Sequence, residues 1–527
     1  MIPLRKEKVI LLPLCVGLAL LIISWFQSYP VSVDSSGDYL FNHISPLYWI
    51  SLPVLLGTLS VVAAKSKKAT LKWIAVLGVV TSMYSISYFH YLLPGSDSHY
   101  VLGQAEYFIA SGDLNPSGAG HSYFQWPLLY TLCSMATNLM GLELMHFEFI
   151  LYAVIGFLYV TSLYGYFSRI DKDSSYVAVI AFFILSPRML NYQFAPFSLA
   201  IGLLFLLFMI ESCGTTSRNT MVATLIIFAS MTLIHPFVPV FFSLYMVVKY
   251  ALSKEKRYVT LFMLTSIIYL TVLVFYTSYF PRAVRHLVMR GREYSQFVET
   301  FTVEPVNPID AVAQTLASTV LIATAMISSL GSMILLLGRK LRHTDHAILI
   351  SGILYAAAGA LIPIFGLRTL CEIAIPLSFG ATFFLKTRFK KYYTVFFLVL
   401  VILSTFVTLH ESFSWKWFQT RDDYRSANFF VEFYDLSDGE RILSHVTVAG
   451  YIQPKIGTSA VFDDGYRFPP DLETYDCIVY TAGLEKSLLM WNYSVETENH
   501  KMEENFNIIF NSGSSFIATN MNASSHG

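Results

Sequence analysis

Charged residues are scarce in this sequence. Only 13% of its 527 residues are Asp, Glu, Lys or Arg, whereas a soluble globular protein carries about 25%. Hydrophobic residues make up 55% of the chain, and the mean hydropathy is +0.55. Too few polar residues are present to cover a water-exposed surface, so the composition excludes a disordered chain and disfavours a soluble enzyme.

Basic charge shows no excess either, because 35 Lys and Arg balance 35 Asp and Glu. Nucleic-acid binding needs a basic surplus to neutralise phosphates, so no nucleic-acid partner is expected. The cysteines are few and scattered without a CxxC pair, which argues against a disulfide framework or a thiolate metal site. They are Cys15, Cys133, Cys213, Cys371 and Cys477. The absence of a Walker loop also disfavours an ATP-driven pump.

Long apolar runs are abundant instead. A helix needs about 20 apolar residues to cross roughly 30 Å of hydrocarbon, and thirteen runs are candidates. They lie near residues 8–26, 47–64, 73–93, 143–168, 175–187, 197–212, 220–235, 237–252, 258–280, 313–337, 345–364, 370–386 and 391–411. The predicted fold is an all-α polytopic membrane protein of about 13 transmembrane helices, followed by a small C-terminal α/β domain.

The Lys and Arg residues predict the orientation. With a cytoplasmic N-terminus, the inner segments carry 21 basic residues, and the outer loops before residue 412 carry 6. Positive residues accumulate on the cytoplasmic side of multi-pass proteins. We therefore expect a multi-pass protein of the cell membrane whose residues 412–527 are extracytoplasmic.

The chain is predicted to have three parts. Residues 1–72 form an N-terminal helical hairpin, residues 73–411 a transmembrane core with an outer loop at 94–142, and residues 412–527 the outer α/β domain. In the last part, strands are expected at 441–446 and 476–481 and helices at 425–434 and 484–493. The short apolar stretch 126–141 is expected to lie in the membrane interface as an amphipathic helix.

The outer loop holds the candidate chemistry. Asp97 directly follows the third span, where partial desolvation makes a carboxylate a better base and lets it hold a cation. His99 lies two residues further on, as a second ligand or base. The alternative is structural: Asp97 caps a helix at 100–111, and His99 is an ordinary interface histidine.

This loop resembles the first outer loop of the GT-C membrane glycosyltransferases. The similarity consists of the Asp97-Ser-His99 element, the helix AEYFIASGDL at 105–114 and an aromatic–Trp126–Pro–Leu segment. Three further segments resemble the family in the same order: SPRMLNYQFAP at 186–196, TLIHPFVP at 232–239 and FGLRTLCEIAIPL at 365–377. The superfamily includes protein O-mannosyltransferases, aminoarabinose transferases and oligosaccharyltransferases.

The resemblance implies transfer of a sugar from a polyprenyl- or dolichyl-phosphate donor to a glycan, protein or lipid acceptor at the outer membrane face. It makes Asp97 and His99 the catalytic residues and, alternatively, ligands of a divalent cation such as Mg or Mn. The substrate-binding residues expected are Glu106, Tyr123, Trp126, His235, Arg368 and Glu372. Arg368 would clamp the donor phosphate through its guanidinium fork.

Alternatives stay open. Arg368 and Glu372 are four residues apart and could instead form a local ion pair. His235 precedes Pro236 and could instead hydrogen-bond a backbone carbonyl that the proline leaves free. The single acid of the Asp-Ser-His element, where relatives have two, leaves the metal undecided, and the Trp-Trp-Asp-Tyr-Gly motif of oligosaccharyltransferases is missing. The competing functions are a transporter or flippase of lipid-linked glycans and a non-catalytic membrane protein of this fold.

Overall fold

The computed structural model describes most of the membrane region and parts of the outer domain. The described residues are 4–30, 43–90, 93, 96–112, 126–186, 195–214, 217–276, 308–337, 343–361, 370–388, 390–412, 421–434, 440–445, 448–449, 451–452, 455, 461–463, 475–481, 484, 506–511 and 516–520.

Within these segments a helix lies at each of the thirteen predicted spans. They are α1 (Leu4–Ser28), α3 (Pro46–Lys65), α4 (Ala69–Met83), α7 (Leu144–Ile170), α8 (Ser175–Leu185), α10 (Pro196–Ser212), α11 (Arg218–Ile234), α12 (Val238–Ser253), α13 (Lys256–Thr271), α16 (Pro308–Leu337), α17 (His343–Leu361), α18 (Leu370–Gly380) and α19 (Lys390–Ser412). Four of the described helices are long and apolar enough to cross a membrane, and they lie in α1, α3, α7 and α13. Several other described helices are apolar but shorter. The number of crossings therefore stays a prediction.

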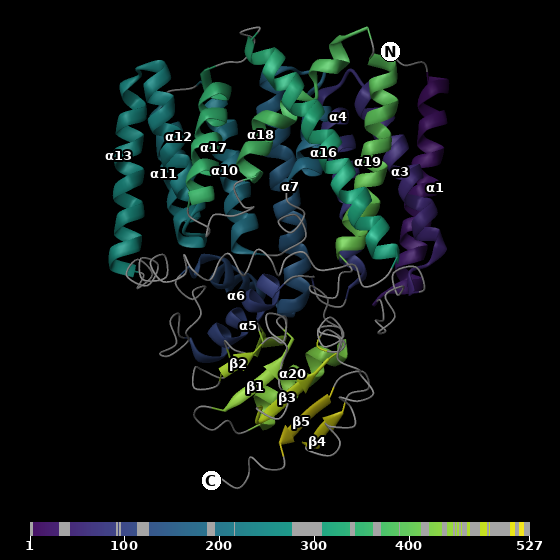
Figure 1. The fold of residues 1–527 in the computed structure, drawn as a ribbon, viewed down its shortest axis with the longest axis vertical. Coiled ribbons are helices and arrows are strands. Elements are labelled where there is room, and N and C mark those ends of the chain that lie inside the picture. The colour runs from purple at the N-terminus through teal and green to yellow at the C-terminus, as the bar shows by residue number, and fades with distance from the viewer. Residues whose placement is uncertain are drawn as a thin grey trace.

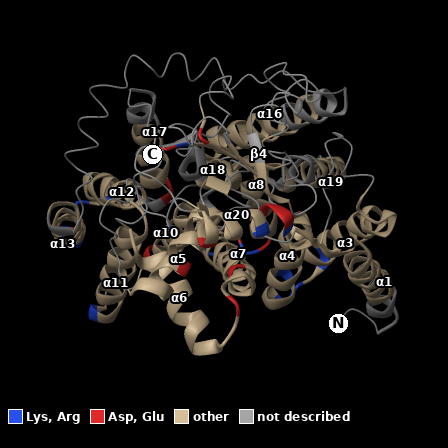
Figure 2. Ribbon diagram, turned by 90° about the horizontal axis from the view of Figure 1, so that it is seen from below, with Lys and Arg blue, Asp and Glu red and all other residues tan. Residues whose placement is uncertain are grey.

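Figure 1 shows these helices side by side in one bundle, with α5 (Ser96–Ser111) and α6 (Leu128–Met140) crosswise beneath it. The strands of the C-terminal domain lie on the far side of α5 and α6, and the N-terminus lies at the opposite end of the bundle. Most of the helical ribbon carries neither Lys, Arg, Asp nor Glu (Figure 2). The first-loop helices thus separate the membrane bundle from the outer domain.

Small residues let two helices of the core approach closely. A Cβ atom added at Gly331 on α16 would lie 2.0 Å from the carbonyl oxygen of Gly380 at the end of α18. Such backbone contact is typical of helix pairs in lipid, where packing rather than hydrophobic burial drives association. It anchors the short helix α18, which overlaps the late segment of the resemblance at 365–377.

Helix α6 has two different faces. Its residues Leu132, Met135, Leu139 and Met140 are exposed apolar side chains, whereas Ser134 is buried and donates its hydroxyl to the carbonyl of Ala105 on α5, at 3.0 Å. Gly141 ends the helix in the left-handed conformation with φ of 65°, which glycine adopts without steric cost. This division of faces fits the predicted interfacial helix.

The outer domain has a five-stranded sheet in the order β2-β1-β3-β5-β4. The strands are β1 (Arg441–Ser444), β2 (Val461–Asp463), β3 (Cys477–Tyr480), β4 (Phe506–Asn511) and β5 (Phe516–Asn520). β1 pairs in parallel with β2 and β3, while β3, β5 and β4 are antiparallel. The predicted strands correspond to β1 and β3, and the predicted helix at 425–434 to α20 (Arg421–Phe433). The helix expected at 484–493 falls outside the described residues, apart from Leu484.

Candidate active site

Helix α5 brings the first-loop residues under the bundle. It begins at Ser96, earlier than the predicted start near residue 100, so Asp97 lies within its first turn rather than ahead of it. Ser and Asp are favoured at this end of a helix because they satisfy free backbone N–H groups and the helix dipole. The side chain of Asp97 lies outside the described atoms, so its role stays a prediction.

His99 is fully buried on α5. The backbone of Leu93 interacts with its ring and favours the protonated form. Burial, with smaller contributions from the nearby His445 and His90, lowers the pKa of His99 to about 3. The imidazole is therefore neutral at pH 7, with one donor and one acceptor.

Three buried groups from distant parts of the chain lie around His99. His90 follows the 3₁₀ turn η1 (Ser85–Phe89) after α4, Glu148 lies in the second turn of α7, and His445 follows strand β1 of the outer domain. All three are at most 2% exposed. His90 and His445 act electrostatically on His99, and the backbone of Leu93 lies against both His99 and Glu148. We call His90, His99, Glu148 and His445 the outer polar cluster.

Glu148 was not a predicted site residue. It is 2% exposed, and the backbone of Leu93 lies against its carboxyl group. Glu106 and Cys133 lie within electrostatic reach of it. The sequence did contain a signal for it, because Glu148 lies inside the apolar run 143–168. An ionisable side chain in a membrane span costs free energy and is usually functional.

Glu106 contacts the C-terminal domain, and its predicted role in substrate binding stays a prediction. Its carboxylate pairs with Lys455 of the outer domain, and the Tyr451 hydroxyl lies 2.7 Å from Oε2. Tyr424 on α20 donates to Oε1 at 3.4 Å. Desolvation raises the pKa of Tyr451 and lowers the pKa of Lys455, an effect that Glu106 opposes for the lysine. The residue thus docks the outer domain onto α5.

The remaining predicted residues are dispersed. Trp126 is buried at the start of α6, and His235 is buried between α11 and α12. The His235 ring packs edge-on against Phe197, and its Nδ1 accepts from the Phe237 N–H at 3.2 Å. This contact favours the alternative in which His235 hydrogen-bonds the backbone at the proline break. Its partner is a backbone N–H group rather than the expected carbonyl.

Two predicted residues, Tyr123 and Arg368, lie outside the described residues. Glu372 is on α18, and its side chain is also outside them. In the described part of the chain, no group of three or more His, Cys, Asp or Glu is arranged to hold a metal ion. The predicted cation ligands Asp97 and His99 therefore stay a prediction.

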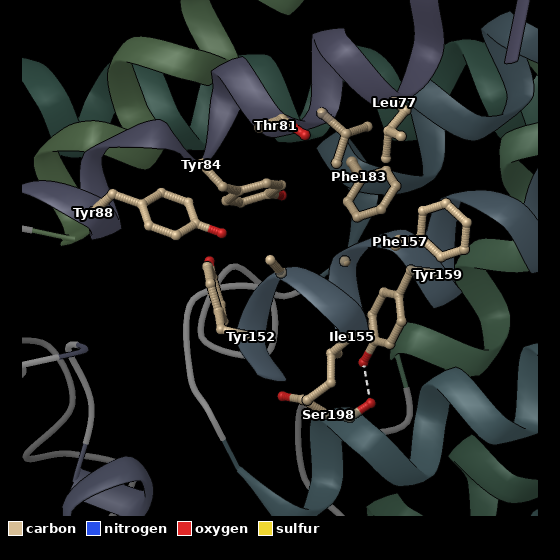
Figure 3. A pocket seen from close by; sticks show the side chains of 13 residues that line it. Leu77, Thr81, Tyr84, Tyr88, Tyr152, Ile155, Phe157, Tyr159, Phe183 and Ser198 are labelled. Atoms are coloured by element: carbon tan, nitrogen blue, oxygen red, sulfur yellow. Dashed lines mark hydrogen bonds between the residues drawn. The ribbon is translucent and has the colours of Figure 1, made fainter. Parts of the chain in front are cut away.

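A cavity of about 100 Å³ lies between α4, α7, α8 and α10. Tyr84, Tyr88 and Tyr152 line one end of it, and the hydroxyl groups of Tyr88 and Tyr152 are turned toward each other (Figure 3). At the other end the Tyr159 hydroxyl donates to the Ser198 carbonyl at 2.6 Å. The remaining wall is largely apolar.

The cavity and the outer polar cluster are neighbours along two elements. Tyr152 lies one helical turn after Glu148 on α7, and residues four apart share a helix face. Tyr88 lies two residues before His90. Two residues of the cavity wall, Tyr88 and Tyr152, are thus close in sequence to His90 and Glu148 of the outer polar cluster.

The buried histidines predict a loss of stability in acid. His99 and His445 each have a folded pKa of about 3 because of burial, against about 6.5 when unfolded. Between these values the unfolded chain binds more protons, so stability falls as the pH falls below 6.5, by about 1.4 kcal/mol per pH unit for each histidine. Denaturation followed at several pH values should show a smaller slope for His445→Gln. The exposed His146→Gln should keep the wild-type slope, and an unchanged slope in both would contradict burial of His445.

Comparisons with known proteins extend only to the fold. No family model matches the chain, and no curated protein matches it. Its structure is similar to ArnT from Cupriavidus metallidurans bound to undecaprenyl phosphate, with 12% identity, a TM-score of 0.42, and coverage of 86% of this chain and 98% of that one. It is also similar to the Archaeoglobus fulgidus oligosaccharyltransferase tethered with an acceptor peptide, with 12% identity, a TM-score of 0.49, and coverage of 86% and 74%. Similarity at this level assigns no activity.

Proposed function

We propose that the protein is a glycosyltransferase that uses a polyprenyl- or dolichyl-phosphate sugar at the outer membrane face. The observation that carries this proposal is the adjacency of the aromatic cavity and the outer polar cluster. A lipid-linked sugar has an isoprenoid tail and a polar head, and needs an apolar pocket that ends at a polar one. The first-loop resemblance to GT-C enzymes supports the same function.

The proposed reaction is a displacement at the anomeric carbon. An acceptor hydroxyl oxygen attacks this carbon, the bond from carbon to phosphate oxygen breaks, and the lipid phosphate leaves with the electron pair. Asp97 takes the hydroxyl proton as general base, and Glu148 is the second carboxylate near the reacting atoms. The acceptor is a glycan, a protein or a lipid.

A divalent cation held by Asp97 and His99 is the alternative role for these residues. Mg²⁺ and Mn²⁺ favour oxygen ligands, while His99 offers a nitrogen and Glu148 is the only carboxylate of the outer polar cluster. The described residues therefore do not fit a complete cation site, and no step is assigned to a metal.

A transporter or flippase is the runner-up function. It is expected to bury charged residues near the bilayer midplane. The buried charged residues described in the spans instead lie in the first or last two turns of their helices, as Lys72, Glu148, Lys249 and Asp345 do. This distribution favours a site at the membrane surface.

The cavity gives a direct test of the lipid donor. A Cβ at Gly156, which lines the cavity, would meet nothing within 4 Å, so Gly156→Leu fills the space without a backbone clash. We expect at least a tenfold rise in KM for a C55 polyprenyl-phosphate hexose, measured in a transfer assay over a panel of donor sugars and acceptors. Gly57→Leu, on α3 and also in open space, is the matched control. Absence of transfer from every donor by the wild type would refute the proposed function.

A further inference from the structure

Helix α5 makes polar contacts with two different neighbours. The Ser134 hydroxyl of α6 donates to the carbonyl oxygen of Ala105 at 3.0 Å. The next residue along α5, Glu106, contacts the outer domain instead. Helix α5 therefore connects α6, beneath the membrane bundle, to the outer domain (Figure 1).

Both carboxylate oxygens of Glu106 are bound by the outer domain. Oε2 pairs with the Lys455 ammonium and lies 2.7 Å from the Tyr451 hydroxyl, and Oε1 accepts from the Tyr424 hydroxyl of α20 at 3.4 Å. The Tyr451 hydroxyl also contacts the Lys455 ammonium and lies 2.7 Å from Asn428 Oδ1 on α20. We call these five residues, one on α5 and four in the outer domain, the docking network.

The docking network is polar although it is largely withdrawn from water. Tyr451 is completely buried, and the side chains of Lys455 and Glu106 are 12% and 27% exposed. Charge-assisted hydrogen bonds require particular atom positions, whereas apolar side chains tolerate repacking. A buried ion pair also stabilises a fold no better than apolar side chains of similar volume often do. This pair therefore suits the fixing of an orientation better than the addition of stability.

The orientation of α5 matters for the proposed reaction because Asp97 lies in the first turn of this helix. Glu106 follows Asp97 by nine residues, about 14 Å along the helix axis, and its carboxylate is occupied by the outer domain. Glu106 therefore acts on Asp97 through the helix rather than by contact. A reacting group misplaced by about 1 Å can lower a rate about 100-fold.

We propose that Glu106 is a positioning residue that, together with Tyr451 and Lys455 of the outer domain, fixes α5 so that Asp97 reaches the acceptor hydroxyl. The inference rests on the proposed function. It gives the outer domain a part in the transfer step, and it differs from the predicted contact of Glu106 with the substrate.

Exchanging the charges of Glu106 and Lys455 tests the proposal. Glu106→Gln and Lys455→Met each remove the ion pair and should lower kcat for sugar transfer by about tenfold or more, with the KM for the donor nearly unchanged. The double variant Glu106→Lys with Lys455→Glu restores the pair in reverse. Because the Tyr451 hydroxyl can both donate and accept, it can contact either arrangement, and we expect kcat to recover most of the loss.

Hydrogen exchange of the full-length protein in nanodiscs gives a readout that does not depend on transfer. Loss of the docking network should speed amide exchange in α5 in both single variants, because fewer contacts hold the helix, and the exchanged pair should slow it again. Glu432→Gln is the matched control. It removes an exposed carboxylate of α20 within electrostatic reach of Lys455, and it should change neither kcat nor the exchange of α5.

Each other result contradicts the proposal. Faster exchange with an unchanged kcat in the single variants means that the docking network is only structural. A raised KM for Glu106→Gln, or no recovery in the exchanged pair, means that Glu106 contacts the substrate itself, and either result leaves the donor class intact. A wild-type protein that transfers from no donor refutes the proposed function as well. If the exchanged pair does not fold, Lys455→Arg keeps the positive charge and should retain kcat where Lys455→Met loses it.

Discussion

Replacing Asp97 by Asn should lower the rate of sugar transfer by about 10²–10⁴-fold, the usual contribution of a general base. The amide keeps the size of the side chain and its hydrogen-bonding ability at the helix terminus, but it cannot accept the proton of the acceptor hydroxyl. Asp97 lies in the first turn of α5, two residues before His99. We expect kcat to fall while donor binding is retained, measured by transfer kinetics and by lipid binding.

Two additional measurements define the role of Asp97. Asp173→Asn removes a carboxylate that is 99% exposed beside Lys72 and should leave transfer unchanged. Chelation of divalent cations distinguishes the base from the cation ligand, since only the second role makes the wild-type rate depend on added Mg²⁺ or Mn²⁺. Transfer by Asp97→Asn within twofold of the wild type would favour another base or a non-catalytic protein.

The helices were readable from the sequence because hydrocarbon imposes a simple rule. In lipid every backbone polar group must be satisfied within the helix, so each span becomes a long apolar run. The helical starts depend on local caps instead. Helix α5 begins at Ser96, whereas the sequence pattern placed its start near residue 100.

The site was less predictable because its residues come from separate parts of the chain. His99 stood out by its place next to Asp97, but its neighbours His90 and His445 are far apart in sequence. Nothing in a local pattern pairs Glu106 with Lys455 across more than 300 residues. Side chains of this kind are brought together by tertiary packing, which hydrophobic periodicity does not encode.

Glu148 gives the second large effect, because stability and activity should change in opposite directions. Its carboxyl group is buried in the bundle beside the backbone of Leu93, and a buried polar group that is not fully hydrogen-bonded costs folding free energy. Glu148→Gln removes the acidic group at nearly constant volume. We expect the variant to unfold at a higher temperature and to transfer sugar about 100-fold more slowly, as happens when a strained polar group is kept for function.

The matched control is Glu143→Gln. Glu143 precedes α7, with 75% of its side chain exposed and the His146 Nδ1 at 3.6 Å, so its loss should change neither quantity. A less stable and fully active Glu148→Gln variant would instead show that the carboxylate has a structural partner. If the variant is more stable and inactive, the bundle keeps a costly buried carboxyl group in the outer polar cluster because the reaction requires it there. The energetic cost of Glu148 is then a consequence of catalysis at the boundary between membrane and water.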